Sequence, residues 1–527
     1  MMQKKIHYRL LALALLLVSV APAEGKMPGN EPENMTGNMP EKMSESLPGK
    51  MLESMPGNMQ EEAPEAINND DGIRPYRNNP WYWEYRGEPV MLVGASDRDN
   101  LWQWTGDVLT GHLDRMKAVG GNYVRNTMSD RNDGDTYAAK RLPDGKYDIT
   151  RWNDEYWNKL KFFLEETHKR DIIVQLTLWD WFDLSGDDVY GRFRLHPLNP
   201  ENNINWEPGT ITNAWDYYGG SLANNNKEAL DYQHRFIDKL ISVTSQYGHV
   251  LYNIGNESGL GVDWDIYWGE YIKEAARNHG RDIYITTMLF APDATVRRVM
   301  NNNHVFSFAD VSQNNQDALG PMGKKHWENL LFWRKMIAMG DHGPMPLNNE
   351  KVYGNGVGTN TAAGTEKEAV ERFWRNIFGG AASTRFHRPA HRGGDFYWGI
   401  GLSERAEQTL RAVNMFLDEF DIFNAEPYEA FSTVGNSVDS YCMANLGKEY
   451  AVYFPGGRAT VHLDPWVHVE RVSVKWLDIA ALTWREEIII EPVWDNFDGT
   501  SWWGPQRIIT LDPGNHRSYV AIVKVLD

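Results

Sequence analysis

Cysteine is almost absent from this chain of 527 residues, which contains a single one, Cys442. A lone cysteine forms no internal disulfide, and without a Cys-x-x-Cys pair the chain lacks a cysteine-rich zinc site. Basic residues are also scarce, because 53 Lys and Arg stand against 72 Asp and Glu and leave a formal net charge of −19. That balance gives no general attraction toward nucleic acid phosphates, so no nucleic acid partner is expected. The P-loop, HExxH and GxSxG motifs are missing as well.

No apolar run near the N-terminus is long enough for a membrane span. Residues 10–21 form an apolar stretch of 12 residues, whereas a spanning helix needs about 20. The stretch follows Lys4, Lys5 and Arg9 and ends at Ala21-Pro22-Ala23. This order predicts a signal peptide over residues 1–23, cleaved near Ala23, and a secreted or periplasmic bacterial protein without stable membrane insertion. An uncleaved membrane anchor is the alternative.

Residues 24–75 have few aromatic or β-branched residues and are rich in Met, Pro, Gly and Glu. The tetrapeptide MPGN at 27–30 recurs at 55–58. Such a composition buries too little surface to offset the entropy of ordering, so we predict a disordered linker. The alternative is a copper(I)-binding tail, because thioethers favour that ion.

From residue 76 to 427, short apolar runs alternate with amphipathic segments, which indicates an α/β fold. The predicted strands cover residues 89–94, 122–128, 172–178, 250–255, 283–288, 304–311, 345–347 and 381–386. The predicted helices cover residues 107–119, 152–169, 227–247, 264–278, 327–339, 365–378 and 404–420. About eight strand–helix units match a (β/α)8 TIM barrel.

Helical periodicity disappears in residues 428–527. Six short apolar runs, at 450–454, 460–463, 472–476, 487–490, 507–511 and 519–525, are separated by Gly, Pro and Asp turns. Many short strands in about 100 residues predict a small all-β sandwich domain. The lone Cys442 lies in a predicted strand of this domain, where we expect it to be a small buried residue.

Two glutamates follow predicted strands of the barrel. Asn256-Glu257 comes after the fourth strand and Asn349-Glu350 after the seventh. In such a barrel the carboxyl ends of the strands surround one site, so both carboxylates should point into it. Two facing carboxyl groups suit glycosidic cleavage, in which one protonates the leaving oxygen and the other attacks the sugar or activates water. Glu257 could instead only begin a helix, and Glu366 or Glu404 could replace Glu350 as its partner.

With these motifs the chain resembles clan A glycoside hydrolases, in particular family 5. The resemblance covers about residues 76–427. It implies that Glu257 is the acid/base, that Glu350 is the nucleophile, and that Asn256 binds a substrate hydroxyl. Arg125 matches the arginine that keeps the nucleophile ionised, although a structural ion pair is an equal alternative. Trp398 resembles the aromatic platform beneath the sugar. The tail resembles a collagen-binding-type module of secreted glycosidases, a label from which no collagen binding is inferred.

Further candidates line the same predicted mouth. Trp179 and Asp180, together with Trp181, follow the third strand and are candidates for the substrate groove; ordinary packing is the alternative for the aromatic rings. Asp97 follows the first strand, and His387 and Arg388 end the eighth. For Arg388 a structural ion pair is favoured over binding of an acidic sugar. Gln313 is the candidate at the end of strand six, where the family often has His or Tyr.

The sequence therefore predicts a secreted, retaining glycoside hydrolase that cleaves a polysaccharide or its oligosaccharides by double displacement, with no cofactor and no metal. Two alternatives remain. One is a non-catalytic carbohydrate-binding barrel protein. The other is a metal-dependent hydrolase, which His387 alone supports poorly because metal sites need several strand-end ligands.

Overall fold

The computed structural model describes residues 71–130, 132–185, 192–289, 293–312, 324–354, 364–389, 399–428, 439–456, 459–462, 469–494 and 507–526. All of them lie in one compact unit. The predicted signal peptide, the predicted linker up to residue 70, and two candidate site residues, Gln313 and Trp398, lie outside the described residues.

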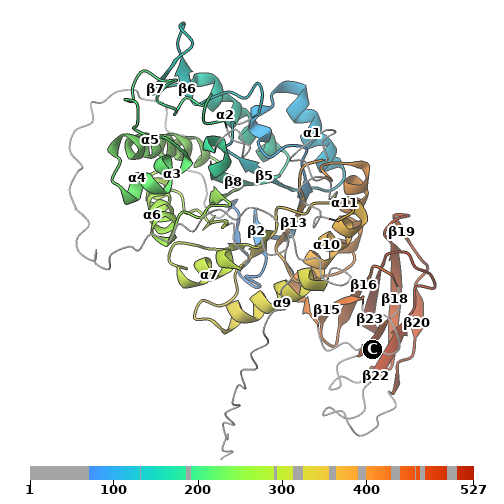
Figure 1. Ribbon diagram of the computed structural model, residues 1–527. Helices are drawn as coiled ribbons and strands as arrows, with labels where there is room; N and C mark the ends of the chain where they lie inside the picture. Colours follow the sequence, from blue (N-terminus) through green and yellow to red (C-terminus); the bar gives the residue numbers. More distant parts are fainter. Residues whose placement is uncertain are drawn as a thin grey trace, which may run out of the picture. The chain divides into compact units, whose positions relative to one another are not determined.

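Short parallel strands form the centre of the fold (Figure 1). They are β4 (Leu92–Ala95), β5 (Tyr123–Thr127), β8 (Ile173–Asp180), β9 (Val250–Asn256), β10 (Ile285–Thr286), β11 (Ala309–Asp310), β12 (Leu347–Asn348) and β13 (Ser383–Phe386). Parallel pairing joins β5, β8, β9 and β10 in order, β11 with β12, and β13 with β4.

Backbone hydrogen bonds connect these three groups of strands. The amide of Asn122 donates to Val93 at 2.9 Å, that of Ser307 to Ile285 at 2.9 Å, and that of Ala382 to Leu347 at 2.8 Å. Each of the parallel strands is therefore linked to the next along the chain, and the last is linked to the first.

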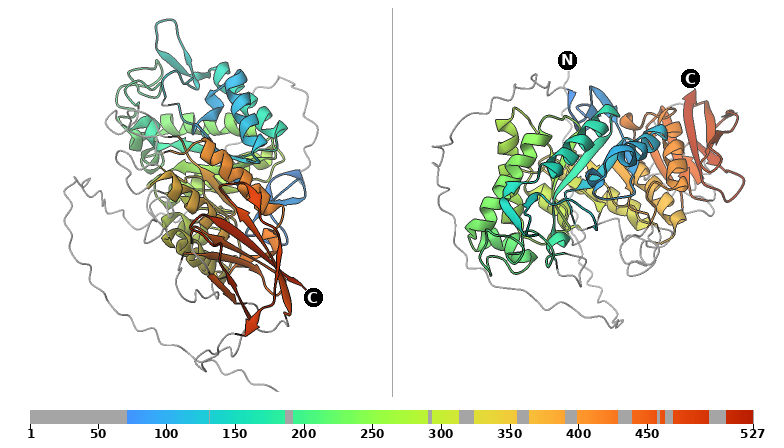
Figure 2. Two further views of the ribbon diagram at one scale, coloured as in Figure 1. Left: turned by 90° about the vertical axis from the view of Figure 1, so that its right-hand side faces the viewer. Right: turned by 90° about the horizontal axis from the view of Figure 1, so that it is seen from above.

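Helices lie on the outside of these strands (Figures 1 and 2). They are α1 (Gly106–Ala118), α2 (Asp154–Lys169), α3 (Ala214–Tyr217), α4 (Gly219–Ala223), α5 (Lys227–Thr244), α6 (Val262–Asn278), α7 (Ala294–Asn301), α9 (Lys324–Met339), α10 (Glu366–Phe378) and α11 (Glu404–Leu417). None of the described helices combines the length and apolarity needed to cross a lipid bilayer.

Local sequence explains where the longer helices begin and which face they bury. Thr365 and Glu368 form a capping box at the start of α10, in which each side chain accepts the other's backbone N–H. Asn153 caps α2, whose buried Tyr156, Leu160 and Phe163 recur at the spacing of one helical face. These signals come from neighbouring residues, which is why the predicted helices match the structure closely.

Gly94 allows β4 and β5 to approach one another. A Cβ atom at this position would overlap the carbonyl oxygen of Tyr123. The backbone–backbone contact leaves no room for any side chain, so glycine is required for this strand junction.

Several predicted boundaries are wrong in detail. Arg74–Pro75 form β1, which pairs with β2 (Trp83–Tyr85), and Ile73 is buried, so the fold begins before the predicted linker boundary at residue 75. The strand predicted at 304–311 is limited to β11, because residues 302–305 form the turn after the unpredicted helix α7. A hairpin of β6 (Ala139–Arg141) and β7 (Tyr147–Trp152) was not predicted either.

The C-terminal region is sheet-rich, consistent with a β domain. One sheet contains β14 (Glu426–Pro427), β15 (Tyr441–Asn445), β16 (Glu449–Phe454), β23 (Tyr519–Leu526), β18 (Arg471–Asp478), β19 (Thr483–Trp484) and β20 (Ile488–Ile490). A second contains β17 (Ala459–His462), β22 (Arg507–Leu511) and β21 (Val493–Trp494). Because β14 pairs with β15, the region begins slightly before the predicted boundary at 428. Cys442 is fully buried in β15.

One hydrophobic core extends from the helices into the C-terminal sheet. Trp374 of α10 stacks on Tyr453 of β16 with ring centroids 5.6 Å apart. The adjacent Arg375 is buried and donates to the hydroxyl of Tyr441 at 2.9 Å, and its guanidinium lies 3.2 Å from Asp439. The sheet therefore completes the burial of α10.

We predict that deleting residues 428–527 yields insoluble or aggregated protein. The deletion exposes Trp374 and its aromatic neighbours, and it removes Tyr441 and Asp439, the partners of the buried guanidinium of Arg375. Soluble expression and size-exclusion chromatography measure the outcome. A soluble, monomeric deletion variant with unchanged helical circular dichroism would contradict the shared core.

Candidate active site

The structure places both predicted carboxylates at the carboxyl ends of strands, and Lys351, which follows Glu350, contacts Glu257. Glu257 directly follows β9, and Glu350 follows β12 after one residue. Glu350 is fully buried, whereas the side chain of Glu257 is 16% exposed. The alternative partners Glu366 and Glu404 lie exposed at the starts of α10 and α11 instead, where Glu366 pairs with Arg405.

Arg125, in the middle of β5, contacts the surroundings of both glutamates. Its Nε lies 3.0 Å from Glu350 Oε1, and its Nη2 donates to Asn256 Oδ1 at 2.8 Å. Its Nη1 lies 3.7 Å from Asp99 Oδ1. Arg125 therefore matches both interpretations of its role. It forms buried ion pairs, as a structural residue would, and one of these pairs is with Glu350, the candidate nucleophile.

Burial dominates the electrostatics of Glu350. Loss of hydration raises its pKa from the ordinary value to about 8, and the charge of Arg125 opposes this rise. Within the described residues neither carboxylate oxygen has a hydrogen-bond donor, because the N–H of Arg125 is not aimed at them. The backbone around Glu350 is well fixed, since its amide donates to Ser312 Oγ at 2.8 Å and its carbonyl accepts from Arg385 at 2.7 Å.

Lys351 is an unpredicted member of the site. Its ammonium donates to Glu257 Oε1 and, at 2.9 Å, to Asn256 Oδ1. The lysine side chain is buried, which lowers its pKa, and the nearby carboxylate of Glu257 counteracts this effect. Its position directly after Glu350 was the available signal, but a sequence does not show which strand end a neighbouring side chain reaches.

Glu257 has a left-handed backbone conformation, with φ of 54°. Few residues other than glycine or asparagine adopt this region, and non-glycine examples cost roughly 1–3 kcal/mol. The next residue, Ser258, donates its amide to Met288 at 3.0 Å. The turn therefore directs the Glu257 side chain toward Lys351 at a conformational cost.

The remaining described candidates divide into two groups. Asp180 lies in the site, because its Oδ1 accepts from Asn256 Nδ2 at 3.2 Å. His387 is buried 3.1 Å from Asp99, and burial together with Arg388 lowers its pKa well below the ordinary value, which favours the neutral imidazole. Asp97 lies further out, where it accepts from the amide of Leu402 at 2.7 Å.

Trp179 does not form an open groove wall. It is 6% exposed, and rings of Tyr217, Tyr218, Phe236 and Trp268 surround it. Its ring therefore has a packing position, the alternative to the substrate groove for this residue. Arg388 lies 3.0 Å from Asp99 Oδ2, in agreement with the ion pair favoured for it.

Two further side chains of the site are not indicated by the sequence. Tyr353 is buried and packs edge-on against His387 with ring centroids 4.5 Å apart. Arg385 of β13 contacts His387 and Ser96, and it donates to the backbone carbonyl of Glu350. Alternation along β13 could have indicated that Arg385 points inward. Among the described residues no group of three or more His, Cys, Asp or Glu is placed to hold a metal ion.

No family model and no curated protein matches this sequence. Solved structures do match. One, described as a glycoside hydrolase, has 11% identity and a TM-score of 0.61 over 87% of this chain and 97% of its own. A glycoside hydrolase of family 5 from Bacteroides vulgatus has 11% identity and a TM-score of 0.60 over 87% of this chain and 94% of its own. The chain shares the fold of these glycoside hydrolases. At such low identity the likeness concerns the fold alone.

We predict that Glu350 titrates near pH 8 and that Arg125→Gln moves this titration to higher pH, because the variant loses the cation that favours the carboxylate. Infrared difference spectra against Glu350→Gln follow the protonated carboxyl band. Arg98→Gln is the matched control, since Arg98 pairs with Asp135. Titration of Glu350 near pH 4.5 in the wild type would contradict the burial argument.

Proposed function

We propose that the chain is a secreted, retaining glycoside hydrolase that acts on a polysaccharide or its oligosaccharides. The observation that carries this proposal is the contact of Arg125 with both Glu350 and Asn256, since one cation then touches the candidate nucleophile and the residue that precedes the candidate acid/base. The fold shared with solved glycoside hydrolases supports the same conclusion. The predicted N-terminal signal supports export.

In this proposal residues 76–427 are a catalytic (β/α)8 barrel, and residues 428–527 are a β-sandwich module. The cyclic linkage of the parallel strands supports barrel closure. The placement of site residues at the carboxyl ends of the strands agrees with the location of active sites in such barrels. The likeness of the C-terminal region to collagen-binding-type modules stays a prediction.

The proposed reaction has two steps. Glu350 attacks the anomeric carbon while Glu257 protonates the leaving oxygen, and a glycosyl-enzyme ester forms on Glu350. Glu257, now ionised, removes a proton from water, which attacks the same carbon and releases the sugar with its original configuration. Arg125 favours the ionised form of Glu350 that the first step requires. Substrate contacts are proposed for Asn256, Asp180, Asp97 and His387, and for Gln313 and Trp398 outside the described residues.

The ammonium of Lys351 affects the protonation of Glu257. An ammonium bonded to a carboxylate favours its ionised form, which suits the base of the second step but opposes the acid of the first. Because Lys351 also donates to Asn256, it has a second partner available while Glu257 turns to the glycosidic oxygen. We infer that Lys351 is a positioning residue that sets the protonation of Glu257.

The same ion pair is the observation that favours a second candidate, a non-catalytic carbohydrate-binding protein. A glutamate engaged by lysine and a fully buried partner glutamate are compatible with a site that binds sugar without cleaving it. Release of a product from a glycan panel separates the two functions.

We predict that Glu257→Gln and Glu350→Gln each lower the turnover of the best substrate in a polysaccharide panel by roughly 10²–10⁴-fold or more, because each removes one of the reacting groups. Reducing-sugar assays measure the rate, and proton NMR of the first product measures its anomeric configuration. Glu366→Gln is the matched control and should retain activity. Turnover close to wild type in either site variant, or an inverted product, would refute the assigned roles.

We predict that Lys351→Met moves the alkaline limb of the kcat/KM profile to higher pH. This limb reports loss of the proton from the general acid in the free enzyme, and removing the cation favours the protonated carboxyl. Lys335→Met on α9 is the control for loss of a lysine elsewhere. An unchanged alkaline limb would show that Lys351 serves packing only.

A further inference from the structure

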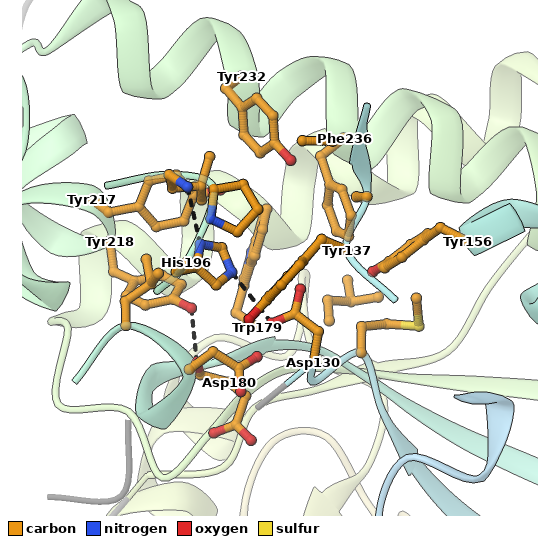
Figure 3. Close-up of a pocket in the computed structure, with 18 residues that line it drawn as sticks. Asp130, Tyr137, Tyr156, Trp179, Asp180, His196, Tyr217, Tyr218, Tyr232 and Phe236 are labelled. Atoms are coloured by element: carbon orange, nitrogen blue, oxygen red, sulfur yellow. Dashed lines mark hydrogen bonds and ion pairs between the residues drawn. The ribbon is translucent and has the colours of Figure 1, made fainter. Parts of the chain in front are cut away.

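A small cavity lies beside the candidate active site, at the ends of β5 and β8 (Figure 3). Its volume is about 50 Å³, enough for a few water molecules or one small chemical group. Seven of its 18 lining residues carry aromatic rings. The aromatic lining residues are Tyr137, Tyr156, Trp179, Tyr217, Tyr218, Tyr232 and Phe236.

Asp130 contributes a carboxylate to the cavity wall, and the residue is only 7% exposed. Its Oδ1 lies 3.2 Å from Nε2 of His196, as the dashed line in Figure 3 indicates. The Nδ1 atom of His196 accepts from the amide of Leu198 at 3.1 Å, so the imidazole proton resides on Nε2, facing Asp130. This single contact does not satisfy the carboxylate.

Two buried polar atoms at the same cavity, Oδ1 of Asp130 and Nε1 of Trp179, have no hydrogen-bond partner within the described chain. Three tyrosines also line the cavity, Tyr156, Tyr217 and Tyr232, which are 1%, 2% and 6% exposed. Burial raises the pKa of each phenol, so the hydroxyls stay protonated and neutral. Buried polar groups without partners are rare in folded proteins, and two of them at one cavity indicate a site for a polar occupant.

The charge of the lining residues selects among polar occupants. Asp130, Asp180 and Asp183 line the cavity, whereas no lysine or arginine is among its lining residues. A carboxylate surrounded by aromatic faces attracts a cation, since the ring faces carry negative electrostatic potential. An anionic group would instead meet repulsion from the aspartates, and the aromatic rings would offer it no compensation.

Asp180 connects this cavity to the two glutamates. Its carboxylate belongs to the cavity wall and also accepts from Asn256, the residue that precedes Glu257. Asp180 and Asn256 are direct neighbours on β8 and β9. A sugar held near Glu257 could therefore extend one small substituent into the cavity, which is too small for a whole ring.

We propose that the cavity is a specificity subsite for a protonated amino group of an amino sugar in the substrate. The assignment rests on the proposed glycosidase function. In it, Asp130 receives the ammonium, the tyrosine hydroxyls complete its hydrogen bonding, and the aromatic rings enclose it. An N-acetylated sugar, which is uncharged and bulkier at this position, is disfavoured.

Isothermal titration calorimetry tests this with the full chain and three amino sugars, glucosamine, galactosamine and mannosamine, at a pH where the amine is protonated. The parent hydroxyl sugars and the N-acetylated sugars are measured alongside. We expect at least one amino sugar to bind about tenfold tighter than its parent. Asp130→Asn, which keeps the shape and removes the charge, should abolish that preference, and Tyr217→Phe should weaken it. Asp133→Asn is the matched control, because Asp133 is exposed and pairs with Arg192.

Equal binding of amino and parent sugars, or an amine preference that survives Asp130→Asn in a folded variant, would overturn the assignment. The outcome is separable from that of the proposed function. Amine-selective binding through Asp130 without product release from any glycan supports the cavity as an amine subsite and refutes the proposed glycosidase function. Cleavage of neutral glycans without an amine preference supports the glycosidase and removes the cavity as an amine subsite.

Discussion

The amide oxygen of Asn256 accepts hydrogen bonds from two cations, Arg125 and Lys351. These donors come from β5 and from the segment after β12, so one acceptor ties together three separate parts of the chain. The same two cations contact the two glutamates, Arg125 beside Glu350 and Lys351 beside Glu257. Asn256 thus fixes which positive charge meets which carboxylate. A side-chain amide can do this without adding charge of its own to a buried site.

Burial and charge act in opposite directions on the two carboxylates. Complete burial favours the protonated form of Glu350, although the nucleophile role proposed for it requires the ionised form. Lys351 favours the ionised form of Glu257, although the proton-donor role proposed for it requires the protonated form. Without a substrate, burial of Glu350 and the contact of Lys351 with Glu257 therefore oppose the protonation states that the first step of the proposed reaction requires. Binding of a sugar changes the hydration and the hydrogen bonding of both groups, so substrate would be required to reach the reactive arrangement.

Much of the fold could be predicted because its signals are local. Periodic apolar residues and capping groups mark α2 and α10, and Glu257 and Glu350 were found because each follows an apolar strand. What could not be predicted depends on tertiary contacts. The sequence does not reveal Lys351 as a site residue, because its partner Glu257 is distant in sequence. It also leaves groove and packing open for Trp179, because a sequence does not separate a buried ring from an exposed one. Polar Arg74–Pro75 resemble a linker, yet backbone pairing with β2 orders them.

The stacking of Trp374 on Tyr453 also bears on how this protein can be rearranged. Proteins of several domains can be rearranged by exchanging one domain for another along a linker. Here α10 buries one of its faces against the C-terminal β region. The two parts therefore do not fold independently, as such an exchange would require. A chimera with a foreign module would need a replacement for the Tyr453 and Tyr441 contacts. Natural variation at this junction should accordingly involve both sides together.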